Sequence, residues 1–210
     1  PRVRRKVLWK ALLNPDGPGS MELFGSIRRW NRRSMGRRAA WRGSTAGFAD
    51  RLFGLQNQIA IMDHLAEWMR QHLDARFASA QLYDPKLKRL RVVAQREFAS
   101  GLLDQFGEMS ITSGTICARA ARVQLPILIS DVTTDEDWVP FLSFSESAGF
   151  GGVLSIPLLS RAGALIGVTS CHFAGRAKPS GSEMKFAQAS CEFASDAILE
   201  IRRVNGNRPA

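Results

Sequence analysis

Cysteine and histidine are scarce in this sequence, with three of each among 210 residues. Cys117, Cys171 and Cys191 are odd in number and show no C-x-x-C spacing, which argues against a disulfide framework and against a zinc site. His64 and His72 lie eight residues apart with no carboxylate at metal spacing, so they predict no metal centre. So few cysteines suit a reducing compartment, and we expect a cytoplasmic protein.

Long apolar runs are also missing. No run approaches the ~20 apolar residues that a membrane helix needs, and the N-terminus lacks the apolar core of a signal peptide. The chain begins with Pro1, and Met21 and Met35 are both candidate start positions. We find no nucleophile–base arrangement, no carboxylate pair and no phosphate-cradling glycine-rich loop. The sequence therefore favours a protein that is not an enzyme.

The formal net charge of +10 is distributed unevenly. Residues 1–49 hold twelve Lys and Arg against two Asp and Glu, whereas residues 50–210 hold seventeen of each sign. A neutral globular part gives no electrostatic footprint for nucleic acid. The composition of residues 1–49 favours a solvated, mostly disordered tail or a translated leader, and a weak contact with an acidic surface stays open. That contact would use the paired arginines Arg28, Arg29, Arg32, Arg33, Arg37 and Arg38.

Two long amphipathic helices are predicted, one at each end of the globular part. Over residues 50–74, apolar residues recur at the three-and-four spacing of one helical face. Ser180 and Glu183 match a capping box, after which one apolar face continues to about Val204. Further apolar residues beside each stripe predict an association surface and a two-fold homodimer in which like helices meet. These residues are Leu65, Trp68, Ile198 and Leu199.

Short apolar runs between the two helices predict an antiparallel sheet. The clearest are two runs within residues 155–173, joined by a connection in which Gly163 supplies a positive φ, and they predict a β-hairpin at the centre of the sheet. Further segments are predicted as strands at 76–83, 89–95 and 126–129, short helices at 97–107, 113–122 and 141–148, and a polar loop at 131–139.

The fold class is therefore α+β. We expect a central antiparallel sheet of about five to six strands, with the two long helices on one face. Short helices and loops should form a ligand pocket on the other face. We assign residues 1–49 to the basic tail, 50–204 to the domain and 205–210 to a C-terminal tail.

The hairpin carries a family resemblance. Its sequence P-L-L-S-R-x-G-x-L-x-G-V-x-S-x-H-F, over residues 157–173, resembles the last two strands of a GAF domain of bacterial signalling proteins. The resemblance covers about residues 52–203, although Ala118 stands where many members have Gly. Further motifs follow in the family's order: Leu82-Tyr83-Asp84-Pro85, Ser113-Gly114-Thr115-Ile116-Cys117, Arg119-Ala120, Asp131-Val132 with Asp135, and Pro179-Ser180 with Glu183.

This resemblance implies a sensory or regulatory module of signal transduction, of the type found in histidine kinases and two-component systems. Such a module binds a small ligand, dimerises through its terminal helices and controls an output domain. Because few residues follow Val204, the output partner would be a separate kinase or another protein. The resemblance identifies neither the ligand nor a cofactor. The candidate ligand-binding residues are Phe106, Cys117, Asp131, Trp138, Phe141, Phe144, Ser155 and His172.

This sequence lacks the cysteines that two known chemistries of GAF domains require. Attachment of a bilin needs a cysteine in the helix before the hairpin, and residues 141–148 contain none. Reduction of methionine sulfoxide needs an attacking cysteine within residues 131–155, which contain none either.

Two alternatives to a ligand sensor stay open. The first is a ligand-free module for interaction and dimerisation. The second is a redox sensor, either a thiol sensor at Cys117 or a haem sensor with His172 as ligand. For these two residues, a small buried thiol and a histidine satisfied at a strand end are the favoured interpretations.

Overall fold

The computed structural model describes residues 45–52, 54–99 and 106–206. Residues Phe48–Ala210 form one compact unit. Its strands are β1 (Phe77–Asp84), β2 (Arg89–Arg96), β3 (Glu108–Ser110), β4 (Ile127–Ile129), β5 (Gly152–Leu159) and β6 (Leu165–Phe173). The helices are α3 (Thr45–Leu52), α4 (Gln58–His72), α6 (Ile116–Val123), α7 (Leu142–Ala148) and α8 (Gly181–Gly206), with 3-10 helices η1 (Val132–Thr134) and η2 (Glu136–Phe141).

The six strands form one antiparallel sheet in the order β3-β2-β1-β6-β5-β4. This confirms the predicted α+β class and the hairpin, which is β5 and β6. The central pair, however, is β1 and β6, because β4 adds to the outer edge of β5. Strand β3 was not predicted, since three residues are too few to show an alternation. The turn glycine Gly163 has φ +84° as expected.

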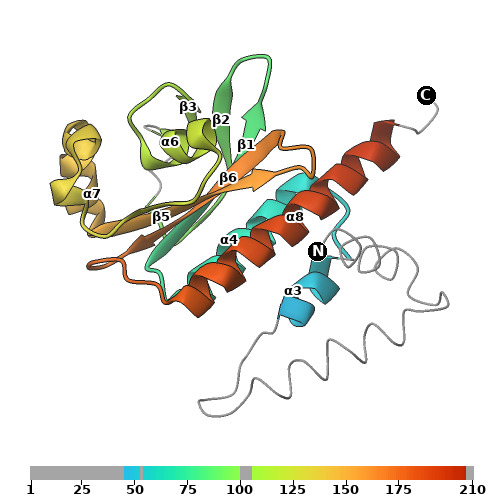
Figure 1. Cartoon of the computed structure of the whole chain (residues 1–210), viewed down its shortest axis with the longest axis horizontal. Helices are drawn as coiled ribbons and strands as arrows, with labels where there is room; N and C mark the ends of the chain where they lie inside the picture. Colours follow the sequence, from blue (N-terminus) through green and yellow to red (C-terminus); the bar gives the residue numbers. More distant parts are fainter. Residues whose placement is uncertain (1–44, 53, 100–105, 207–210) are drawn as a thin grey trace, which may run out of the picture. The chain divides into compact units, whose positions relative to one another are not determined.

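The two long helices lie side by side on one face of the sheet, and α6 and α7 lie on the other (Figure 1). Alternate side chains of β1 and β5, among them Ala78, Ala80 and Leu154, point into a core shared with α4 and α8. The predicted capping box is present, because Glu183 N donates to Ser180 Oγ at 3.2 Å and Ser180 N donates to Glu183 Oε2 at 2.6 Å. None of the described helices is both long and apolar enough to cross a membrane.

The first predicted helix is in fact two. Helix α3 ends at Leu52, and α4 begins after Asn57, whose side-chain oxygen accepts a hydrogen bond from Ala60 N at 2.9 Å. That cap starts a new helix. The apolar spacing seen in the sequence therefore runs across the break between α3 and α4. Helix α3 begins before the predicted domain boundary at residue 50, and Phe48 is fully buried against Trp68, with ring centroids 5.3 Å apart.

Some predictions for side chains and loops need correction. Leu65, Trp68 and Ile198 are buried within the domain and so cannot form the exposed surface that was predicted for them. Trp68 is covered by Phe48 and Phe186. The predicted polar loop at residues 131–139 contains η1 and most of η2. Most of the predicted helix at 97–107 lies outside the described residues, as does the basic tail up to residue 44.

Candidate ligand pocket

A cavity lies between the sheet and the segments that cover its second face. Its floor comes from β1, β2, β5 and β6, and its walls come from β3, α6, η2, α7 and Phe106. The cavity volume is about 40 Å³, which at ~10–15 Å³ for each water position gives room for roughly three water molecules. The lining residues are Ser79, Gln81, Val92, Phe106, Met109, Thr115, Ile116, Cys117, Trp138, Phe144, Val153, Ser155, Ser170 and His172.

The floor of the cavity is polar although its walls are apolar. Strand alternation turns Ser79 and Gln81 of β1 toward the cavity, while the intervening Ala80 faces the long helices. The neighbouring strands add Ser155 and Ser170, whose hydroxyls are hydrogen-bonded to each other at 2.8 Å. Three adjacent central strands therefore place a row of polar groups beneath an aromatic wall.

Two polar atoms of the floor have no hydrogen-bond partner. They are Gln81 Oε1 and His172 Nδ1, in side chains whose residues are only 3% and 8% exposed. The His172 ring lies edge-on to Phe98 and Phe150, with centroids 4.9 Å from each. Burial lowers the pKa of His172 from 6.5 to about 3, so the ring is neutral near pH 7. An unpaired buried polar atom is costly unless water or another polar group pairs with it.

Residues 57–199 match the model of the GAF domain family. The chain belongs to this family. GAF domains are sensory and regulatory modules that occur in kinases, phytochromes and phosphotransferases, which confirms the resemblance drawn from the hairpin. At a stringent significance threshold, no curated protein matches the chain.

Solved structures share the GAF fold at low sequence identity. The GAF domain of an Acinetobacter phosphoenolpyruvate-protein phosphotransferase has a TM-score of 0.63 and 12% identity, over 76% of this chain and 92% of that chain. Free methionine-R-sulfoxide reductase from Neisseria meningitidis, in complex with its substrate, has a TM-score of 0.65 and 13% identity, over 81% and 98%. A bacteriophytochrome from the photosynthetic bacterium R. palustris has a TM-score of 0.62 and 15% identity, over 82% and 40%.

The structure places most of the predicted site residues of this GAF domain together. Phe106, Cys117, Trp138, Phe144, Ser155 and His172 all line the cavity. Phe141 does not, because its ring packs behind Trp138 and Phe106, at centroid distances of 5.0 Å and 5.9 Å. Asp131 lies outside the cavity too: its Oδ1 accepts from Thr133 N at 3.1 Å, and its Oδ2 pairs with Arg176 at 3.1 Å. Asp131 is thus an N-cap of η1.

Sequence reasoning missed the polar residues of the central strands. Ser79, Gln81 and Ser170 lie on the cavity floor, and none was predicted. A signal did exist, because Ala78, Ala80 and Leu82 alternate with Phe77, Ser79 and Gln81. That alternation separates an apolar face from a mixed face, but it does not say which face meets the cavity. The other missed residues of the lining are Val92, Met109, Thr115, Ile116 and Val153.

Cys117 lines the cavity as a buried thiol. Burial raises its pKa, and hydrogen bonds from Thr115 and Gln81 oppose that rise. The Cys117 sulfur lies 3.1 Å from Met109 Sδ and 3.4 Å from Thr115 Oγ1, and its single hydrogen can donate to either atom. Since the thiolate is the reactive form of cysteine, this thiol is poorly reactive.

One ion-pair network holds the aromatic wall of the GAF cavity in place. Arg119 of α6 pairs with Asp135 at 2.7 Å and with Asp137 at 2.8 Å. Asp135 Oδ1 accepts from Trp138 N at 3.0 Å, and the Trp138 indole donates to Ser145 Oγ at 3.3 Å. Among the residues that the structure describes, no group of three or more His, Cys, Asp or Glu is placed to hold a metal ion.

Proposed function

We propose that this GAF domain is a non-catalytic sensory module that binds a small ligand in the cavity and regulates a separate output protein. One observation carries the proposal: Gln81 Oε1 and His172 Nδ1 are buried at the cavity without a partner. A cavity built only for packing would have apolar groups there, because an unpaired buried polar atom destabilises the fold. A ligand that pairs with both atoms offsets that cost.

The thiols support a non-catalytic role. Burial raises the pKa of Cys171 to about 12 and the pKa of Cys191 well above its usual value. Both lie in the core that the sheet shares with the long helices, whereas Cys117 lines the cavity on the opposite face of the sheet. A thiol cycle like that of a sulfoxide reductase needs a second thiol near the first. The same burial disfavours a thiol sensor at Cys117.

The cavity also disfavours the haem alternative. Its volume is about 40 Å³, whereas pockets for drug-sized ligands and cofactors span ~300–1,000 Å³. The His172 ring also packs edge-on against Phe98 and Phe150, at centroid distances of 4.9 Å. The dimensions support a ligand of a few non-hydrogen atoms.

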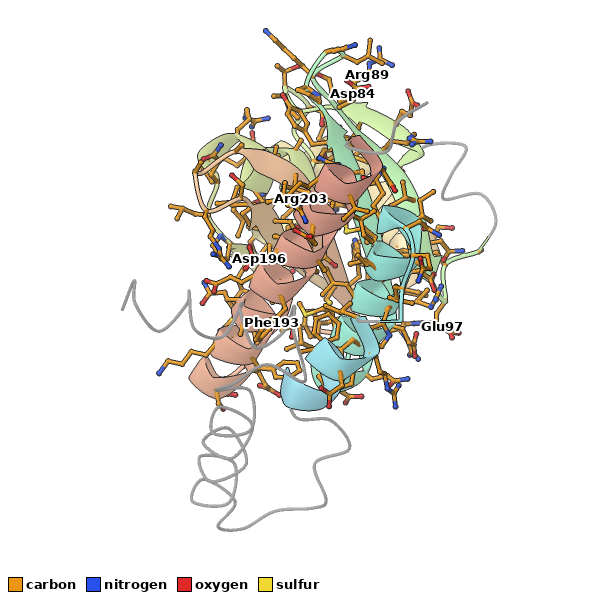
Figure 2. All side chains as sticks on the ribbon, turned by 90° about the vertical axis from the view of Figure 1, so that its right-hand side faces the viewer. Asp84, Arg89, Glu97, Phe193, Asp196 and Arg203 are labelled. Atoms are coloured by element: carbon orange, nitrogen blue, oxygen red, sulfur yellow. The ribbon has the colours of Figure 1, made fainter. Side chains whose placement is uncertain are left out.

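We further propose that the module dimerises through the outer surface of its terminal helices. On α8, Phe193 and Ile201 are only partly buried, and Val204 is 41% exposed, while Ile59 of α4 is 47% exposed. Figure 2 shows Phe193 on α8, with α4 beside that helix. Sedimentation of Phe193→Glu should give a monomer where the parent gives a dimer, and Leu87→Glu should not. A parent that is monomeric at tens of micromolar would exclude this assembly.

Native mass spectrometry of the full chain tests the ligand proposal. We expect a small-molecule adduct that is lost under denaturing conditions. Replacing Gln81 by Leu should abolish the adduct, whereas Gln188→Leu on the exposed surface of α8 should keep it. A parent without an adduct, together with no response to small polar molecules, would instead favour the ligand-free interaction module.

A further inference from the structure

We infer that the cavity selects a small uncharged molecule that donates a hydrogen bond, through an N–H or O–H group, to Gln81. The inference rests on the proposed sensory function, and it names the chemical class of the ligand.

The first observation is that none of the described lining side chains is charged. The lining side chains are hydroxyl, thiol, amide, imidazole or apolar groups, and none of those described is Asp, Glu, Lys or Arg. An ion entering such a site loses its hydration and meets no counter-charge. His172 supplies no positive charge, because its buried ring is neutral near pH 7. The lining thus favours neutral molecules over both carboxylates and ammonium ions.

The second observation gives the direction of the hydrogen bond. The unpaired atom of Gln81 is the carbonyl oxygen Oε1, which only accepts, so the ligand must donate. Gln81 cannot turn away with its strand, because β1 is paired on both sides, with Val92 of β2 and Val168 of β6 opposite Gln81.

The third observation concerns the other end of the ligand. His172 Nδ1 either donates or accepts, depending on the tautomer. The first residues of α6, Ile116 and Cys117, also line the cavity, and Thr115 caps this helix without a side-chain hydrogen bond. The first backbone N–H groups of a helix lack partners within it. A ligand that carries an acceptor beside its donor, as a carboxamide does, matches this arrangement. Its donor pairs with Gln81 Oε1, and its acceptor pairs with His172 Nδ1 or with the first N–H groups of α6.

Four molecules of the same size and shape test the inference. Acetamide is neutral and donates, acetone is neutral but only accepts, acetate is an anion and acetamidinium is a cation. Each is titrated at pH 7 into the isotope-labelled full chain, with the NMR signals of the Gln81 amide and the His172 ring as the readout. Acetamide should bind best, with acetone about ten-fold weaker because Gln81 stays unpaired. The two ions should be weaker still.

Variants of Gln81 give a matched control. Gln81→Leu should abolish the preference for acetamide over acetone, whereas Gln81→Glu should shift the preference to acetamidinium. Gln188→Leu, on the exposed side of α8, should leave the order unchanged. If circular dichroism shows that Gln81→Glu does not fold, the preference of Gln81→Leu for acetamide over acetone still tests the role of Gln81.

The outcomes separate this inference from the proposed function. Tightest binding of acetate or acetamidinium by the parent would overturn the uncharged class and keep the pocket. An unchanged order in Gln81→Leu would overturn the role of Gln81. If none of the four molecules shifts the signals of Gln81 or His172, both the inference and the proposal of a small-ligand sensor are lost.

Discussion

Arg119 on α6 and Asp135 at the start of η2 form an ion pair of 2.7 Å, and their side chains are only 14% and 9% exposed. The Asp135 carboxylate also accepts a hydrogen bond from Trp138 N, and the Trp138 side chain lines the cavity. The pair therefore ties the segment that carries Trp138 to α6, whose first residues also line the cavity.

Replacing Arg119 with Met should leave Asp135 buried without a counter-charge. We expect a loss of about 2–4 kcal/mol in the free energy of unfolding, because removing one partner of a buried pair costs more than the pair contributes. Urea denaturation measures it, and Trp138 should exchange its indole proton faster. The control is Arg176→Met, whose ion pair with Asp131 involves a 68% exposed Arg side chain and should cost less than ~1 kcal/mol. Equal losses in the two variants would contradict the assigned role.

The buried His172 should make the domain less stable in acid. Its pKa is lowered from 6.5 to about 3 by burial, so the unfolded chain takes up this proton at a higher pH than the folded domain does. The contribution of His172 to the free energy of unfolding is fully present above pH 6.5. It is lost as the pH falls toward 3, by up to about 1.4 kcal/mol for each pH unit. His172→Gln should flatten the decline between pH 7 and pH 5 in urea titrations. The pKa of His64 is also lowered, chiefly by burial, so this residue too makes the domain less stable in acid. We expect His64→Gln to flatten the decline less than His172→Gln does. A decline as steep in His172→Gln as in the parent would refute the assignment.

Two glycines of the hairpin should respond differently to Ala. A Cβ on Gly167 would lie 2.2 Å from the backbone oxygen of Gln81, so β6 and β1 would have to move apart. We expect Gly167→Ala to cost about 3 kcal/mol or more and to disturb the cavity floor. Gly163 has open space but φ +84°, so Gly163→Ala should cost only about 1 kcal/mol. Thermal melts compare the two, and similar losses would show that the sheet relaxes around position 167.

Truncations should place the start of the folded domain. Phe48 is fully buried and stacks on His64 and Trp68, at centroid distances of 5.2 Å and 5.3 Å. Removing residues 1–44 should leave the melting temperature nearly unchanged, whereas removing residues 1–48 should lower it markedly. Phe48→Ala in the full chain should cost about 3 kcal/mol. A large drop on removing 1–44 alone would show that this segment also stabilises the domain.

The same truncation tests the arginine pairs. If Arg28, Arg29, Arg32, Arg33, Arg37 and Arg38 contact acidic surfaces, removing residues 1–44 should abolish binding to anionic vesicles and leave neutral vesicles unaffected. Binding that survives the truncation would assign it to the domain instead.

Local patterns by themselves predicted most of the order of elements, but not β3 or the break between α3 and α4. The hairpin turn at Gly163 and the capping box of Ser180 and Glu183 were predicted from neighbouring residues, because each signal depends on a few positions in one segment. The motifs of the GAF family added the place of the pocket.

Only the tertiary structure decided which faces meet. Leu65 and Trp68 lie beside the apolar stripe in sequence, yet they are buried, because Phe48 of one segment and Phe186 of another cover Trp68. Likewise, alternation in β1 defines two faces, but only pairing with β6 and coverage by α6 turn Gln81 into the floor of a cavity. Such contacts join residues far apart in the chain, so no short window of sequence encodes them.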